Sequence, residues 1–183
     1  SATAYGGGVA ELLATHVPLL RSVGIDAEWQ VIHGSDEFFG VTKAVHNALQ
    51  GADVEWTTDM QRTYLEKVLD NALLLEGSYD FIVVHDPQPV AMLSFLRDTA
   101  VDTPDTRWIW RCHIDLTDAN PAVWEFFRPH VERYDASVWT MPEFVPASLE
   151  MDRIVHAPPC IDPLSVKNLD LPAPFVTEIC KQY

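Results

Sequence analysis

Short apolar runs alternate with longer amphipathic segments along most of this chain, and this alternation constrains the fold more than any other feature. The run 80–84 (Asp-Phe-Ile-Val-Val) is almost wholly apolar, as a strand buried on both faces of a parallel sheet requires. Segments with apolar residues three or four positions apart predict helices. Strands separated by helices are typical of βαβ units. We therefore predict an α/β fold with a Rossmann-like, doubly wound parallel sheet.

The same patterns predict the boundaries of the elements. Thr57 or Thr58 is the expected N-cap of one helix, and Gly24 is expected to end another. From residue 158 onward five prolines indicate an extended linker, so we divide the chain into a domain over 1–157 and a linker or tail over 158–183. The expected helices cover 8–23, 38–49, 59–75, 89–97 and 121–133, and the expected strands cover 28–32, 80–84, 108–112, 136–140 and 154–156.

Composition excludes several classes of protein. An apolar fraction of 48% and a mean hydropathy of -0.01 are typical of a soluble globular protein, and no apolar run is long enough to span a membrane. The net charge of -15 argues against binding to nucleic acid or to anionic membranes. The three cysteines are widely spaced and form no CxxC pair, which favours a reducing compartment over a disulfide framework. We expect a cytoplasmic protein.

Three glycines, Gly6, Gly7 and Gly8, directly precede a helix-forming run that begins at Val9. Glycine permits positive φ and lets a ligand approach the backbone closely. A helix start offers free N–H groups and the positive end of the helix dipole, which together suit phosphate or sugar hydroxyls. The run matches neither a dinucleotide-binding motif nor a P-loop, so a tight turn remains an alternative. In this fold a strand normally precedes such a loop, and with only residues 1–5 before it we expect the first strand to be missing.

Polar side chains follow two successive predicted strands. His85, Asp86 and Gln88 come after the run 80–84, and Arg111 and His113 stand at and just beyond the end of the strand at 108–112. Ligands bind at the carboxyl ends of strands in open α/β sheets, so these groups are expected to meet at one rim. A single histidine there would more often cap a strand, whereas the two together favour binding. The spacing gives no HExxH motif, and we expect no metal site.

The predicted helix over 38–49 carries Thr42, Lys43, His46 and Asn47 at near-helical spacing. From spacing alone a solvated face is the favoured interpretation, and a ligand-facing surface is the alternative. Cations are scarce in this chain, which makes Lys43 and Arg111 candidates for contacts with phosphate.

Motifs along the whole chain resemble the trehalose glycosyltransferring synthases. They are Gly-Gly-Gly-Val-Ala-Glu at 6–11, Glu-Phe-Phe-x-Val-Thr-Lys at 37–43, His-Asn-x-Leu-Gln-Gly at 46–51, His-Asp-Pro-Gln-Pro at 85–89, Trp-Arg-Cys-His-Ile-Asp-Leu at 110–116 and Pro-Pro-x-Ile-Asp-Pro-Leu-Ser at 158–165.

The resemblance implies the N-terminal half of a retaining, two-domain GT-B glycosyltransferase that makes trehalose reversibly from a nucleoside-diphosphate glucose and glucose. It implies that the glycine loop and His113 face the interdomain cleft, with His113 contacting the donor sugar. The second domain, which holds most of the nucleotide site, is expected to be absent here, so we expect the isolated chain to be inactive.

The candidate sites and partners follow from the rim and from the resemblance together. No cofactor can be read from the sequence beyond the nucleoside-diphosphate glucose donor. The expected partners are glucose and trehalose, with a homo-oligomer as an option. The alternatives are a trehalose phosphorylase of the same class and a non-catalytic module that binds a sugar or nucleotide. The candidate catalytic residues are His113 and Asp86, and the candidate substrate-binding residues are Gly6, Gly7, Gly8, Val9, Lys43, His85, Gln88 and Arg111.

Overall fold

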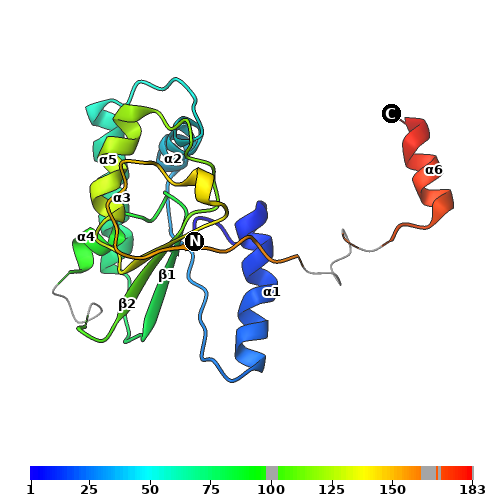
Figure 1. Cartoon of the computed structure of the whole chain (residues 1–183), viewed down its shortest axis with the longest axis horizontal. Helices are drawn as coiled ribbons and strands as arrows, with labels where there is room; N and C mark the ends of the chain where they lie inside the picture. The colour runs from blue at the N-terminus through cyan, green and yellow to red at the C-terminus, as the bar shows by residue number, and fades with distance from the viewer. Residues whose placement is uncertain (98–102, 162–167, 169, 183) are drawn as a thin grey trace.

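The structure is a computed structural model that describes residues 1–97, 103–161, 168 and 170–182, and it confirms the predicted α/β class. Helices precede and separate the strands of a parallel sheet, as the alternating pattern predicts (Figure 1). In chain order the elements are α1 (Gly8–Ser22), α2 (Asp36–Leu49), α3 (Thr58–Leu73), β1 (Phe81–His85), α4 (Met92–Leu96), β2 (Arg107–Arg111), α5 (Pro121–Val131), β3 (Ala136–Trp139), the 3-10 turn η1 (Pro142–Phe144), β4 (Ile154–His156) and α6 (Ala173–Gln182).

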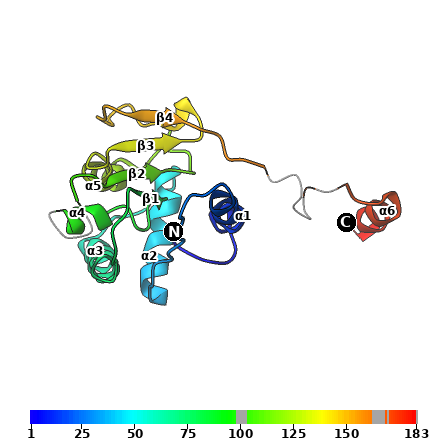
Figure 2. The same ribbon diagram turned by 90° about the horizontal axis from the view of Figure 1, so that it is seen from below.

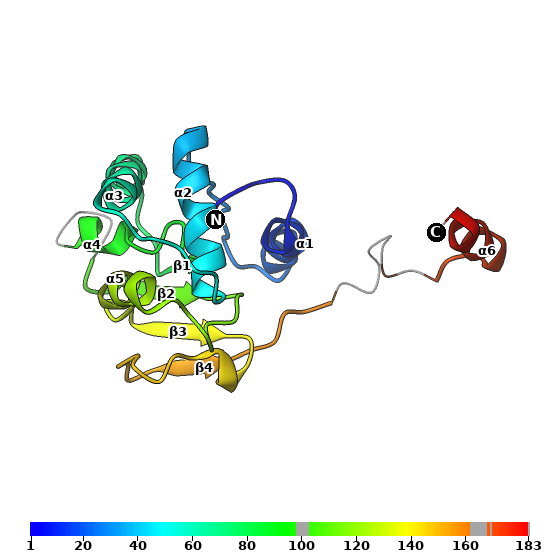
Figure 3. The same ribbon diagram turned by 90° about the horizontal axis from the view of Figure 1, so that it is seen from above.

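The four strands lie in the order β1-β2-β3-β4, and every neighbouring pair is parallel. Their carboxyl ends therefore meet at one edge of the sheet, where His85 of β1 is in register with Arg111 of β2. Helices α3, α4 and α5 gather on one side of the sheet, and α1 stands on the other (Figures 2 and 3). This arrangement leaves the carboxyl ends of β1 and β2 between α1 and the helical layer.

The core is built around tryptophans from successive strands. Trp108, Trp110 and Trp139 are fully buried, and the rings of Trp110 and Trp139 meet edge to face with centroids 5.3 Å apart. The prediction that the run 80–84 is buried on both faces is wrong, because Phe81 is 65% exposed and Val83 is 47% exposed. β1 is an edge strand, and the face that carries Phe81 and Val83 is exposed until His85 at its end.

The helix ends follow the predicted chemistry. Gly24 has φ +90°, its N–H donates to Arg21 O (3.1 Å), and the N–H of Ile25 donates to Leu20 O (3.0 Å). These two bonds form a Schellman motif, which explains why α1 ends here. Thr57, one of the two predicted N-caps, accepts a hydrogen bond from the first turn of α3. Within the described part of the chain, no helix combines the length and the apolar character needed to cross a bilayer.

Two predictions of local structure are wrong. Residues 28–32 are extended but form no strand, since their described ladder bonds go to Ser1 alone: its amine donates to Gln30 O and its carbonyl accepts from the N–H of Ile32, both at 3.0 Å. The predicted linker contains a helix, α6, whose described side chains are exposed. Of the predicted helix over 89–97, only α4 is regular helix.

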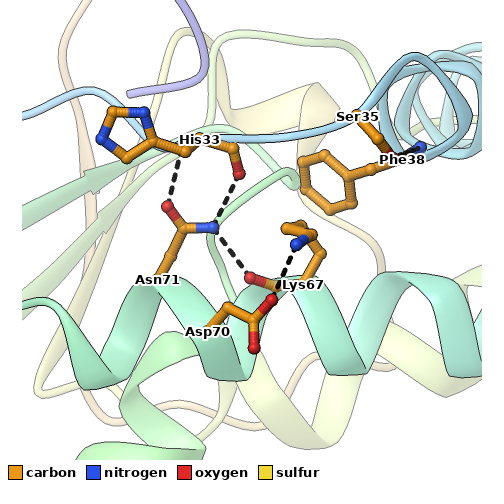
Figure 4. Close-up of polar contacts among 6 residues, drawn as sticks. All are labelled: His33, Ser35, Phe38, Lys67, Asp70 and Asn71. Carbon is orange, nitrogen blue, oxygen red and sulfur yellow. Dashed lines mark hydrogen bonds and ion pairs between the residues drawn. The ribbon is translucent and has the colours of Figure 1, made fainter.

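One asparagine fixes the extended segment that leads from α1 to α2 (Figure 4). Asn71 of α3 accepts the N–H of His33 on Oδ1 (2.7 Å) and donates from Nδ2 to His33 O and Lys67 O (both 2.8 Å). A buried amide that makes three bonds has nearly exhausted its hydrogen-bonding capacity. Two residues further on, Ser35 caps α2 by accepting the N–H of Phe38 (3.2 Å). Asn71 and Ser35 thus place the start of α2.

Candidate active site at the carboxyl ends of β1 and β2

Asp86 directly follows β1 and occupies a strained position. Its φ of +63° is the one left-handed value outside glycine among the described residues. Aspartate tolerates this conformation better than most residues, and such strain is concentrated at functional sites. Three hydrogen bonds hold Asp86: its N–H donates to Arg111 O (2.9 Å), its carbonyl accepts from Nε1 of Trp110 (3.0 Å), and Oδ1 accepts the N–H of His113 (2.9 Å). Asp86 therefore ties the end of β1 to the loop that follows β2.

The side chains of His85 and His113 meet at this rim. Nδ1 of His85 lies 2.9 Å from Nε2 of His113, and the ring planes differ by 11° with centroids 5.2 Å apart. Such a short nitrogen distance between nearly parallel rings with separated centroids describes contact at the ring edges, as an N–H···N bond requires. The predicted convergence of these two histidines is thus present in the structure.

Burial sets the protonation of this cluster. Desolvation lowers the pKa of His85 to about 3, with further lowering by His113, the chain's amino group, Arg111 and His16. Desolvation also lowers the pKa of His113 to about 4, with a smaller effect of Arg111. Both imidazoles are therefore neutral near pH 7. Burial raises the pKa of Asp86, while the N–H of His113 opposes that rise.

Arg111 lies behind the histidines, at the end of β2. It is 8% exposed, and its Nη2 donates to Ala157 O, just beyond β4. Its Nη1 is buried and has no hydrogen-bond partner among the described residues. A buried donor without a partner is uncommon and costly. The guanidinium thus couples the rim to the last strand and keeps one donor available.

The glycine loop has a different character. Gly6 and Gly7 have φ of +67° and +100°, which side-chain-bearing residues rarely adopt. No side chain caps α1, and a Cβ placed on Gly6, Gly7 or Gly8 would meet nothing within 4 Å. Val9 is partly buried on the first turn of the helix. The loop presents its backbone to open space, which suits the predicted anion site.

A small cavity of about 240 Å³ brings Lys43 of α2 together with Gln88 of the loop after β1. Oε1 of Gln88 is buried and has no partner among the described residues, so it can accept a hydrogen bond from a ligand. The lining residues supply one aromatic ring and hydroxyl, ammonium, imidazole and amide groups, although most of the accessible lining surface is apolar. The cavity is lined by Ala2, Thr3, Phe39, Thr42, Lys43, His46 and Gln88.

Comparison with known proteins identifies the family. Residues 1–146 match the family described as "Trehalose synthase, N-terminal domain". This chain belongs to the trehalose synthase family. It is 44% identical to a trehalose synthase of Pyrococcus horikoshii over all of its length and 43% of that protein's, and 46% identical to one of Thermococcus litoralis over 93% of its length and 40% of that protein's. A trehalose synthase of Rubrobacter xylanophilus is 44% identical over the whole chain and 44% of its own length. The chain thus spans less than half the length of these relatives.

Among trehalose synthase motifs, the Glu-Phe-Phe-x-Val-Thr-Lys segment supplies cavity residues that sequence reasoning missed. The favoured prediction placed Thr42 on a solvated face, but Thr42 is 3% exposed and lines the cavity together with the half-buried His46. The prediction fails because residues 2 and 3 lie against this face of α2. The spacing of residues within a helix does not reveal a contact with a segment that is distant along the chain. Asn47 is exposed, as a solvated face predicts. Phe39 carries no signal in the sequence that separates it from a core residue.

The candidate residues form two groups rather than one. His85, Asp86, Arg111 and His113 are linked by the bonds described above, and Lys43 and Gln88 share the cavity. Among the residues that the structure describes, no hydrogen bond given above joins the glycine loop to either group. In the part of the chain that the structure describes, no group of three or more His, Cys, Asp or Glu side chains could hold a metal ion.

Proposed function

We propose that this chain is the N-terminal part of a retaining GT-B glycosyltransferase that forms trehalose from a nucleoside-diphosphate glucose and glucose, reversibly and in the cytoplasm. Membership of the trehalose synthase family over residues 1–146 is the observation that carries the proposal. The polar rim at the strand ends supports it, because donors and acceptors for sugar hydroxyls lie where open α/β sheets bind ligands.

The residues take distinct roles in this proposal. His113 contacts the donor glucose, and Asp86 is the carboxylate beside the reacting sugars. Backbone N–H groups at Gly6, Gly7, Gly8 and Val9 stabilise the negative charge that develops on the leaving diphosphate. Arg111 assists with its spare donor if the rim opens toward the cleft.

The cavity beneath α2 is the proposed site of the acceptor glucose. Lys43 and Gln88 bind its hydroxyls, and the exposed ring of Phe39 provides an apolar face. The volume of about 240 Å³ is matched to a single sugar ring rather than to a nucleotide. The remaining length of the relatives leaves room for a second domain that binds the nucleotide.

The atoms of the proposed reaction balance between the two substrates. The bond between the anomeric carbon and the diphosphate oxygen breaks, and a bond to the acceptor oxygen forms on the same face. The acceptor's hydroxyl proton passes to the departing diphosphate. Neutral histidines at the rim fit this route, since they donate or accept hydrogen bonds without adding a charge beside the developing oxocarbenium ion.

The test uses the full-length protein with UDP-, ADP- or GDP-glucose and glucose, with and without a chelator, followed by NMR of the products. We expect a disaccharide joined through both anomeric carbons, with retained configuration at the donor carbon. Absence of this product with every donor contradicts the proposal. Formation of glucose 1-phosphate from trehalose and inorganic phosphate instead indicates a phosphorylase.

A matched comparison tests whether transfer requires more than the 183 residues of this chain. The isolated 183-residue chain should show no measurable transfer and at most weak binding of glucose, because closure of two domains normally completes such a site. Turnover by the isolated chain near the rate of the full-length protein contradicts this part of the proposal.

A further inference from the structure

We propose that His85 is a positioning residue for His113. Nδ1 of His85 is hydrogen-bonded to Nε2 of His113, so that only Nδ1 of the His113 ring remains to contact a sugar. The hydrogen bond between the two rings carries the inference. The role of the free nitrogen rests on the proposed function, whereas the pairing itself does not.

The geometry fixes His113 at both ends. Its main-chain N–H is held by Oδ1 of Asp86 at 2.9 Å, and its far ring nitrogen is held by His85 at the same distance. His85 is the last residue of β1, is 9% exposed, and is paired in register with Arg111. A partner anchored in the sheet can set the plane of the imidazole as well as its position.

The pair also couples the tautomers of the two rings. When both rings are neutral, one hydrogen lies between Nδ1 of His85 and Nε2 of His113. If His85 supplies that hydrogen, His113 carries its own on Nδ1 and is a donor toward the ligand. If His113 supplies it, Nδ1 of His113 is bare and is an acceptor. Whether His113 donates or accepts at a sugar hydroxyl is therefore decided by His85.

The electrostatic surroundings keep the pair neutral, as this coupling requires. Protonation of both rings would put hydrogen on both facing nitrogens, abolish the bond and place two positive charges side by side. Arg111 and His16 face the pair, and both oppose a positive charge on His85. Asp86, with His46 near it, is the acidic neighbour, and burial raises its pKa.

Two variants of His85 separate positioning from packing. In His85→Asn the side-chain amide can replace Nδ1 and retain the bond to His113, whereas His85→Leu retains volume and removes every polar atom. Urea unfolding of each variant monitors the fold.

The decisive measurement is nitrogen-15 NMR of the full-length protein labelled at histidine. We expect a scalar coupling across the hydrogen bond between the two rings, and ring-nitrogen shifts of His113 that indicate one dominant tautomer. In His85→Leu these shifts should move toward a mixture of tautomers, whereas His85→Asn should stay close to the wild type. Absence of the coupling, or identical His113 shifts in all three proteins, overturns the proposal. If His85→Leu does not fold, the scalar coupling in the wild type and the spectrum of His85→Asn still decide whether the two rings are hydrogen-bonded.

Kinetics tests the functional half separately. We expect kcat/KM for transfer to fall about tenfold or more in His85→Leu and to stay within about threefold in His85→Asn, since only the former removes the positioning bond. Intact coupling in a protein without transferase activity would contradict the proposed function and leave the pairing in place. Equal activity of the two variants would overturn the positioning role.

Discussion

The rim at the ends of β1 and β2 and the glycine loop ahead of α1 are two separate parts of the proposed site, and they are built in opposite ways. At the rim, His85, Asp86 and Arg111 are buried, and the groups at and just beyond the ends of the two strands are bonded to one another. The glycines of the loop carry no side chain, a Cβ placed on any of them would meet nothing within 4 Å, and the buried residues of α1 lie outside the main core cluster. The side chains of the rim are preorganised by their bonds to one another. The loop instead supplies backbone N–H groups, which can bind a ligand only while no side chain covers them.

The largest expected effect comes from covering the loop. Gly7→Val should abolish transferase activity in the full-length protein, because a β-branched residue disfavours the φ of +100° at this position and occupies the space proposed for the diphosphate. The cost in the free energy of unfolding should stay at about 1–3 kcal/mol. A thermal melt and an activity assay on the same preparation test this. A folded and fully active variant would show that the glycines form only a turn.

The next effect concerns the rim. His113→Ala should lower kcat/KM by about ten- to a thousandfold, which is about 1.4–4 kcal/mol of transition-state stabilisation. The loss in folding stability should be smaller, because the imidazole is partly exposed and its main-chain bond to Asp86 does not depend on the side chain. Steady-state kinetics with urea unfolding measures both quantities. An unchanged kcat/KM would mean that His113 has only a structural role.

The rim should also make stability depend on pH, whereas the loop has no ionisable side chain. The pKa values of His85 (about 3) and His113 (about 4) lie below the ordinary 6.5, so the unfolded chain binds more protons between these values. The free energy of unfolding should therefore fall as the pH is lowered from about 6.5 toward 4. Asp86, whose pKa is raised by burial, opposes this trend.

The contribution of one histidine can be isolated by difference. Urea unfolding of the wild type and of His85→Asn at pH 7 and at pH 4.5 should show a smaller loss of stability in the variant, because it lacks one of the shifted groups. An equal loss in both proteins would mean that His85 titrates as it does in the unfolded chain.

The smallest expected effect is a difference in folding stability between alanine variants of two neighbouring glycines of the loop. Gly8 is the first residue of α1 and does not have a positive φ, so Gly8→Ala should leave folding stability unchanged or raise it by up to about 1 kcal/mol. Gly7→Ala at the neighbouring position should lower it, because alanine is strained at φ +100°. A paired set of thermal melts measures the difference. Equal melting temperatures would contradict the assigned backbone conformations.

The sequence predicts the rim because the residues that form it directly follow recognisable strands. The strands at 80–84 and 108–112 are visible as apolar runs, and a parallel sheet places the residues after them side by side. Such local patterns do not reveal contacts between segments that are distant along the chain. Sequence reasoning therefore misses the cover of residues 2 and 3 over α2 and the bond between the rings of His85 and His113. It also overstates the burial of Phe81, since apolarity does not reveal that β1 is an edge strand.

The amide of Asn71 has a consequence for how the molecule opens. Hydrogen exchange reports the smallest unit that must come apart before a backbone N–H meets solvent. The N–H of His33 lies in an extended segment without a strand, yet its acceptor is a side chain of α3. Its exchange should therefore follow the separation of α3 from this segment rather than local fraying. One side chain thus joins the connection before α2 to α3 as a single cooperative unit, although 38 positions separate the two residues.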